Sequence, residues 1–135
     1  MNKAMMIGAA QWFLRLALAA GFLSAVADRF GMWGRPGAPN VAWGNWQRFV
    51  EYVAKLNWFV PEHAIPALAW ASTLGELLVA LGLLIGWQLR SFALAGGLLL
   101  LSFAVTMTMA LGIKAPLDFS VFGAAAGAFL LAAIC

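Results

Sequence analysis

The chain has 135 residues, of which 64% are hydrophobic and only 10% charged, and its mean hydropathy is +0.91. These values exclude a soluble domain, which could not hide so much apolar surface, and they predict an integral membrane protein. The net charge of +3 does not indicate a nucleic-acid partner, because the eight Lys and Arg residues are scattered and flank apolar segments, as membrane-interface anchors do. The single cysteine, Cys135, excludes an intramolecular disulfide and a C-x-x-C redox motif.

The first apolar segment runs from about residue 4 to residue 27. Lys3 before it and Ala25-Val26-Ala27 at its end imitate a signal peptide with its cleavage site. The apolar run is longer than a signal sequence needs, however, and it contains Gln11 and Arg15. We therefore expect a retained first transmembrane helix.

A long connection follows, over residues 30–65. Its first part is rich in Gly and Pro and reads as irregular chain. Residues 43–57 then have helical periodicity, with Trp46, Phe49, Val50 and Val53 on one face and the charged residues Arg48, Glu51 and Lys55 on the other. This pattern is typical of a short helix at the membrane interface, and we interpret it as a lid over the bundle.

Three more apolar segments follow, at about residues 66–87, 91–111 and 117–135. Each approaches the ~20 residues needed to cross a ~30 Å hydrocarbon core, the last only just, and none is evidently interrupted. The predicted fold is an all-α membrane protein: one domain over residues 1–135, a four-transmembrane-helix bundle with a long first loop that contains a short interfacial helix.

Small residues mark the predicted packing faces. Gly82-x-x-x-Gly86 closes the second span, Gly96-Gly97 lies in the third, and Gly123 to Gly127 opens the fourth. Small residues let helix backbones approach closely in a membrane. We expect them to pack the bundle internally; a homo-oligomer is the alternative.

Two charges of opposite sign lie near the middle of apolar segments. Arg15 is central in the first span and Glu76 in the second, and each has polar neighbours one helical turn away. A charge at that depth costs at least ~2.5–3.5 kcal/mol on insertion scales, so a paired arginine and carboxylate is the natural arrangement. We predict a buried Arg15–Glu76 ion pair, acting either as a clamp between helices or as part of a ligand or proton site.

A second polar group is expected at the loop end of the bundle. Alternation of the spans through the membrane places six residues on that side, where they could line a ligand pocket under the loop or simply be interfacial polar residues: Asp28, Arg29, His63, Thr106, Lys114 and Asp118.

The sequence offers no protein-bound redox centre. A single histidine excludes a bis-His haem, and no cluster provides the ligands that a metal needs. No Gly-rich phosphate loop precedes a helix, and no Ser-His-Asp set can be assembled, so catalytic residues stay unassigned. Redox chemistry would require a diffusible carrier, such as a quinone, or a partner protein.

The order of these features resembles the DoxX/DoxD-like family of small four-helix membrane proteins. The resemblance rests on Leu14-Arg15-Leu16-Ala17-Leu18, on Leu74-Gly75-Glu76-Leu77-Leu78 with Leu81-Gly82-Leu83, and on Arg90. Its positions in this chain are Arg15, Glu76, Gly82 and Arg90. Asp28-Arg29 and the long first loop depart from the family pattern.

The resemblance implies a component of a membrane quinone oxidoreductase that handles sulfur or thiol compounds, located in a bacterial inner (plasma) membrane. Lipid and a quinone or another isoprenoid are then the expected partners, with a soluble redox protein. The alternative function is a non-catalytic scaffold or assembly factor for such a partner. A small-solute or lipid transporter is a third alternative, which four short helices accommodate poorly.

Overall fold

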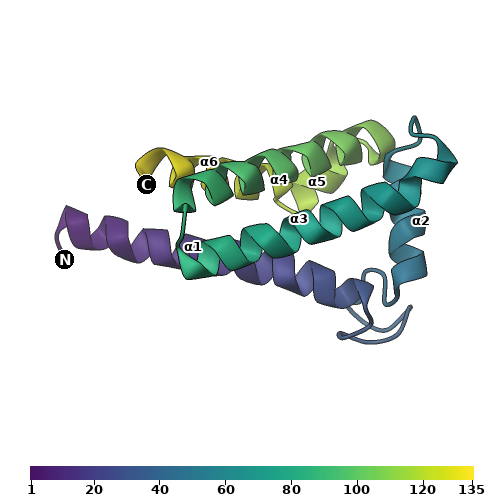
Figure 1. Ribbon diagram of the computed structural model, residues 1–135, viewed down its shortest axis with the longest axis horizontal. Helices are drawn as coiled ribbons and strands as arrows, with labels where there is room; N and C mark the ends of the chain where they lie inside the picture. Colours follow the sequence, from purple (N-terminus) through teal and green to yellow (C-terminus); the bar gives the residue numbers. More distant parts are fainter.

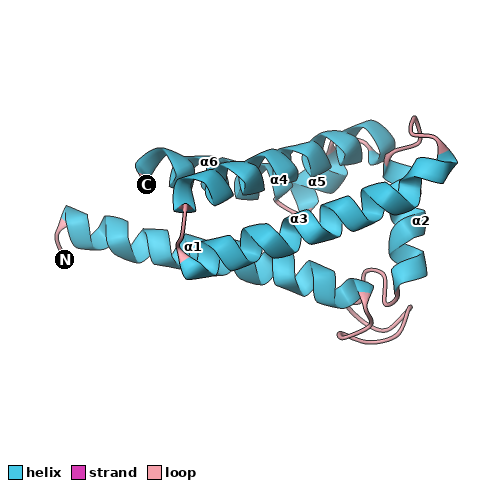
Figure 2. Ribbon diagram, viewed as in Figure 1, coloured by secondary structure: helices cyan, strands magenta, loops and turns pink.

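The computed structural model covers residues 1–135 and is entirely helical, with no β-strand (Figure 2). Its elements, in chain order, are α1 (Lys3–Arg29), α2 (Trp46–Leu56), the 3₁₀ helix η1 (Glu62–Ala64), α3 (Ile65–Ile85), α4 (Leu89–Leu111), α5 (Lys114–Asp118) and α6 (Val121–Ile134). The first three predicted spans coincide with α1, α3 and α4 to within a few residues. The periodic segment in the long loop is α2.

The long helices form a closed bundle (Figure 1). α1 contacts α3, α3 contacts α4, α4 contacts α6, and α6 returns to α1. α2 lies across one end of this bundle and packs on α3 and α4, and both chain termini lie at the opposite end (Figure 1). We call the α2 end the lid end and the other the terminal end.

Local sequence signals explain where the helices begin and end. The side chain of Asn2 accepts a hydrogen bond from the Met5 amide (2.9 Å) at the start of α1, and Asn45 does the same for Arg48 (2.8 Å) at the start of α2. Pro66 lies in the first turn of α3, where the amide it lacks would have no partner. Gly86 ends α3 in the left-handed conformation (φ +83°).

Small residues and a few large ones share the core between the four long helices. Its buried members are Leu18, Ala19, Phe22, Val79, Ala80, Leu83, Ala93, Ala128, Leu131 and Ala132. A smaller cluster joins the lid to α3 through Phe49, Val53, Ile65 and Ala69. The lid is therefore packed against the bundle as one unit rather than held by its loops alone.

Three helices are long and apolar enough to cross a membrane: α1, η1 with α3, and α4. They expose large apolar side chains, such as Leu78, Ile85 and Leu98, around the bundle. Such a surface fits contact with lipid acyl chains. The chain is thus an all-helical protein with the attributes of a membrane protein.

The predicted fourth span is not one continuous helix. α5 ends at Asp118 and α6 begins at Val121, because Ser120 between them adopts a left-handed conformation (φ +55°). α6 has 14 residues, so it measures only about 21 Å. The expectation that no span is interrupted was wrong at this point.

Helices α3 and α4 make a close contact at Gly82. A Cβ atom added there would overlap the ring of Phe92 on α4, whereas one added at Gly75, on the same helix, would find its nearest neighbour, a methyl of Leu99, at 3.9 Å. Gly82 therefore sets how closely α3 and α4 approach.

We expect Gly82→Ala to lower the free energy of unfolding by about 1–3 kcal/mol, because the ring of Phe92 must move. Gly75→Ala is the matched control and should be neutral or stabilising, because alanine favours a helix more than glycine does. Reversible unfolding in mixed detergent micelles measures both. Equal effects of the two substitutions would contradict the packing described here.

Candidate functional site

Arg29, the last residue of α1, lies at the centre of a buried polar group. Its Nη1 atom donates a hydrogen bond to Thr73 Oγ1 (2.8 Å) and forms an ion pair with Glu76 Oε2. Thr73 and Glu76 lie one turn apart on α3, and the three residues are 3%, 1% and 2% exposed. Taking two charges this far out of water is costly, so the pair persists only because each charge meets the other and the hydroxyl adds a further bond.

The predicted Arg15–Glu76 pair was wrong. Arg15 instead lies at the C-terminal end of α3, where its Nε donates to the carbonyl of Leu83 (2.7 Å) and its Nη2 to that of Leu84 (3.3 Å). The last carbonyls of a helix have no partner within it and form the negative end of the helix dipole, so a cation binds there favourably.

The register of α1 against α3 accounts for this exchange of partners. The 27 residues of α1 span about 40 Å, more than the 21 residues of α3, and the N-terminal part of α1 extends beyond the α3–α4 turn (Figure 1). The midpoint of α1 therefore meets the end of α3 rather than its middle. Gly86 leaves the space, since a Cβ there would lie 2.7 Å from Arg15 Nη2.

Aromatic rings of the lid cover the Arg29 guanidinium. Its Cζ atom lies 3.8 Å from the centre of the Phe49 ring and 5.2 Å from that of Trp43. Trp43 packs edge-on against Phe49 (5.0 Å) and at a tilt against Tyr52 (5.6 Å). The ring faces attract the cation, and they keep water from the ion pair. Burial also raises the pKa of the Tyr52 phenol, so this ring stays neutral at physiological pH.

Asp28, next to Arg29, fixes the loop that carries Trp43. Its carboxylate accepts hydrogen bonds from the amides of Ala42 (2.8 Å), Trp43 (2.8 Å) and Gly44 (2.9 Å). Gly44 has a φ of +82°, and a side chain there would overlap the backbone at Pro36. The two adjacent residues thus have different partners: Asp28 fixes the loop before α2, and Arg29 binds Thr73 and Glu76 of α3.

A second set of rings lies on the flank of the lid, half exposed. Phe30 stacks on Trp46 (5.4 Å, 11° between the planes), and Trp46 packs on Trp70 of α3 (4.2 Å). Phe30 and Trp70 are 49% and 46% exposed. We call Phe30, Trp46 and Trp70 the aromatic flank; it offers flat apolar faces beside the buried ion pair.

One buried donor in this site has no partner. Arg29 Nε is buried and makes no hydrogen bond, and it is the one buried side-chain nitrogen or oxygen in the chain of which this is true. Leaving a buried donor unpaired costs about 1–3 kcal/mol. A buried group of this kind requires an explanation, and a ligand oxygen is one.

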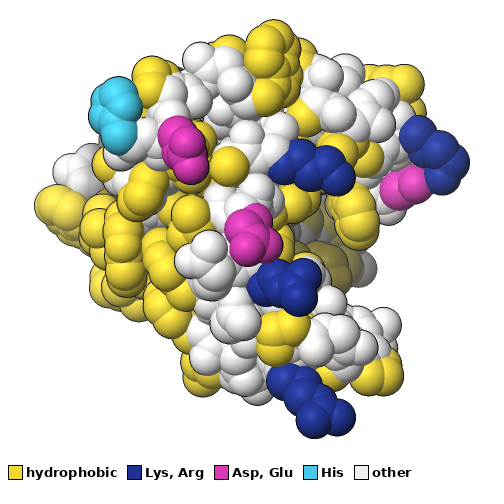
Figure 3. All heavy atoms as spheres, turned by 90° about the vertical axis from the view of Figure 1, so that its right-hand side faces the viewer, with side chains coloured by type: hydrophobic (Ala, Val, Ile, Leu, Met, Phe, Trp, Pro, Cys, Tyr) yellow, Lys and Arg dark blue, Asp and Glu magenta, His cyan; other side chains and the backbone are white.

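The predicted second cluster does not form one pocket. Of its six members only Asp28 and Arg29 belong to the buried site. His63 is exposed in η1, Thr106 bonds back to the carbonyls of Ser102 and Phe103 on its own helix (3.1 Å each), and Lys114 pairs with Asp118 (2.6 Å) on the surface of α5. Figure 3, which faces the lid end, shows charged side chains dispersed among apolar ones rather than gathered.

Sequence reasoning missed Arg29 as the partner of Glu76 and the rings as the cover of the guanidinium. The sequence contained one signal for the aromatic cover: Phe49 lies on the apolar face of the helix predicted over residues 43–57, the face that a lid turns toward the bundle. Thr73 is one of the polar neighbours that the sequence places about one turn from Glu76, but its bond to Arg29 has no signal of its own in the sequence.

Comparison with family models, with curated proteins and with solved structures finds no match to this chain. The resemblance of Arg15, Glu76, Gly82 and Arg90 to the DoxX/DoxD-like pattern stays a prediction. In the structure these four residues have separate roles: Glu76 pairs with Arg29, Arg15 binds the end of α3, and Gly82 accommodates Phe92. Arg90 lies exposed in the first turn of α4.

We expect Glu76→Ala to lower the free energy of unfolding by about 3–5 kcal/mol, because it leaves Arg29 buried without a counter-charge. Glu76→Gln should cost less, since its amide oxygen can still accept from Nη1. Asp118→Ala breaks the other ion pair of the chain, which is exposed, and should cost less than about 1 kcal/mol. Unfolding in mixed micelles compares the three variants; a Glu76→Ala effect no larger than that of Asp118→Ala would contradict a structural ion pair.

Proposed function

We propose that the chain is a DoxX-like, four-span subunit of a bacterial inner-membrane oxidoreductase, and that its lid end binds the headgroup of a quinone. The unpaired Nε–H of Arg29 is the observation that carries this proposal. Sulfur or thiol compounds are the proposed electron source, oxidised at a soluble partner.

The fourth span in this proposal is α5 and α6 together. Both helices pack along α4, and Lys114–Ile134 returns the chain to the end at which α1 begins (Figure 1). An interrupted span is tolerated in a membrane where neighbouring helices cover the break. Here α4 packs along the helices on both sides of the break, while Ser120 itself is exposed.

The residues around Arg29 fit a quinone headgroup in two respects. A quinone carbonyl oxygen is an acceptor, and pairing it with the Arg29 Nε–H would remove the cost of the buried unpaired donor. The headgroup is also a flat ring on an isoprenoid tail, and the half-exposed aromatic flank offers ring faces on which such a ring can stack. Access to Nε requires the lid to shift, because Phe49 and Trp43 cover the guanidinium.

A bound quinone would supply the capacity to accept two electrons and two protons. The contribution of the chain itself is positional. Arg29 orients an acceptor oxygen, the lid rings exclude water, and Glu76 holds Arg29 in place through Oε2.

The test is mass spectrometry of an organic extract from protein purified in mild detergent. We expect a quinone in near-stoichiometric amount from the native chain. Trp46→Leu removes the ring between Phe30 and Trp70 and should weaken binding of a short-chain quinone about fivefold, the equivalent of one aromatic contact. Trp87→Leu, an exposed tryptophan at the terminal end, is the matched control and should bind normally. An extract with bulk phospholipid but no quinone would contradict the proposal.

A scaffold for a soluble redox partner is the second candidate function. It is favoured by the outer face of α2, where Arg48, Glu51 and Lys55 are exposed and form no ion pair within the chain. Under this alternative a partner protein co-purifies stoichiometrically without a bound quinone. Neutralising Arg48 and Lys55 together would then release the partner, whereas quinone binding at the aromatic flank would not depend on these charges.

A further inference from the structure

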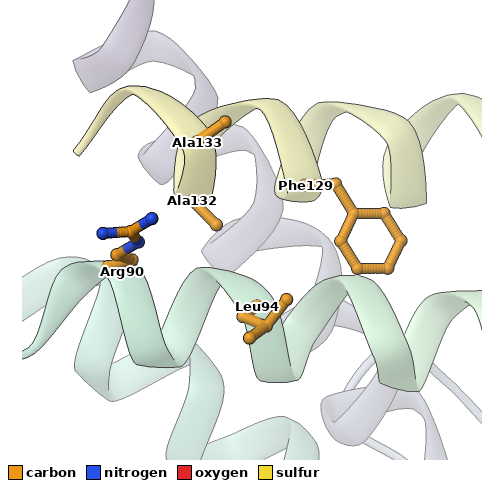
Figure 4. Close-up of a pocket in the computed structure, with 5 residues that line it drawn as sticks. All are labelled: Arg90, Leu94, Phe129, Ala132 and Ala133. Carbon is orange, nitrogen blue, oxygen red and sulfur yellow. The ribbon is translucent and has the colours of Figure 1, made fainter.

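A surface hollow between α4 and α6 lies at the terminal end, away from the buried ion pair. It is a shallow depression, open to the surface, with a volume of about 230 Å³, and it is lined by Arg90, Leu94, Phe129, Ala132 and Ala133. Figure 4 shows Arg90 at one end of the hollow, beside the last turns of α6, and Phe129 at the other. The hollow is thus polar at its outer end and apolar along its length.

Small residues create this shape. The ring of Phe129 packs against α4 at Gly97, where a Cβ would lie only 2.8 Å from the ring. Ala132 and Ala133, one turn further along α6, leave the space beside Arg90 unfilled. Leu94 is 47% exposed, so the hollow opens on the outer, apolar surface of the bundle.

The guanidinium of Arg90 has hydrogen-bond donors without a partner in the protein. It is exposed, takes part in neither of the two ion pairs of the chain, and its side chain makes no hydrogen bond within the protein. It lies in the first turn of α4, whose N-cap residue Gln88 provides no side-chain acceptor for the free amides of that turn. A guanidinium with five N–H donors beside the positive end of a helix dipole is a favourable partner for a phosphate group.

The surroundings favour a lipid with a net negative headgroup. The other cationic residues toward this end are Lys3 and Arg15, whereas the acidic residues lie elsewhere: Asp28, Glu51 and Glu62 around the lid, Glu76 on α3 facing Arg29, and Asp118 on α5. A soluble anion would gain nothing from four apolar lining residues. A phospholipid matches both parts of the hollow, with its phosphate at Arg90 and the first part of an acyl chain along Leu94 and Phe129.

We propose that this hollow is a binding site for one anionic phospholipid of the surrounding bilayer. The site is independent of the quinone proposal, because it uses different residues at the other end of the bundle. It would fix α6 against α4 where α6 ends.

Native mass spectrometry of the detergent-purified protein, titrated with phosphatidylglycerol or phosphatidylcholine, tests the proposal. We expect the native chain to retain one phosphatidylglycerol in preference to phosphatidylcholine. Arg90→Gln should weaken phosphatidylglycerol binding about fivefold, the contribution of one basic residue at an anionic lipid surface. Ala133→Trp should weaken both lipids, because an indole would fill the hollow without entering the core.

Lys3→Gln is the matched control, since it removes one positive charge from the same end but lies outside the hollow. Equal losses with Lys3→Gln and Arg90→Gln would overturn the proposal in favour of general charge attraction. Equal binding of the two lipids by the native chain, or full binding by Ala133→Trp, would also overturn it. Circular dichroism of each variant confirms that the helices are intact.

Discussion

The ion pair between Arg29 and Glu76 is the interaction on which the lid end of this protein depends. It joins the end of α1 to the middle of α3 inside an apolar bundle, where either charge alone would be costly. Because Asp28 is the neighbour of Arg29, the same turn of α1 also fixes the loop before α2 through three backbone amides. The loop that leads into the lid is therefore bound by Asp28, the neighbour of the arginine that the lid covers.

This arrangement explains why Arg29 can leave one buried donor, Nε–H, unpaired. Nη1 satisfies Thr73 and Glu76, and the faces of Phe49 and Trp43 surround the guanidinium but accept no conventional hydrogen bond. The unpaired Nε–H lies in an environment that favours an acceptor with a flat apolar body. The proposed quinone follows from this combination of an acceptor requirement and aromatic surroundings.

The two ends of the bundle differ in their chemistry. The lid end carries both signs of charge, an aromatic cover and a buried pair, whereas the terminal end carries Lys3, Arg15 and Arg90 and a shallow apolar hollow. Arg15 is already occupied by the carbonyls at the end of α3, so Arg90 is the cation left free beside the hollow. The proposed ligands of the two ends differ accordingly, a neutral ring at one and an anionic headgroup at the other.

Much of the fold could be predicted from the sequence, because apolar length and Gly or Pro punctuation directly determine helices such as α3 and α4. The amphipathic pattern of α2 likewise predicted a lid. The partner of Glu76 could not be predicted by assuming that each span is centred at the same depth. The register of one helix against its neighbour depends on individual side-chain contacts that the hydrophobic periodicity does not reveal. Examples are Arg15 in the space beside Gly86 and the ring of Phe92 on Gly82. The break at Ser120 could not be predicted either, because the apolar pattern continues past it and does not indicate that its backbone adopts a left-handed conformation.

Double-mutant cycles measure the central interaction most directly. One cycle combines Arg29→Met with Glu76→Gln, and the other combines Arg15→Met with Glu76→Gln, with unfolding free energies measured in mixed micelles. The structure predicts a coupling energy of about 1–3 kcal/mol between Arg29 and Glu76, and additivity within about 0.5 kcal/mol for Arg15 and Glu76. Strong coupling of Glu76 to Arg15 together with additivity at Arg29 would contradict the account.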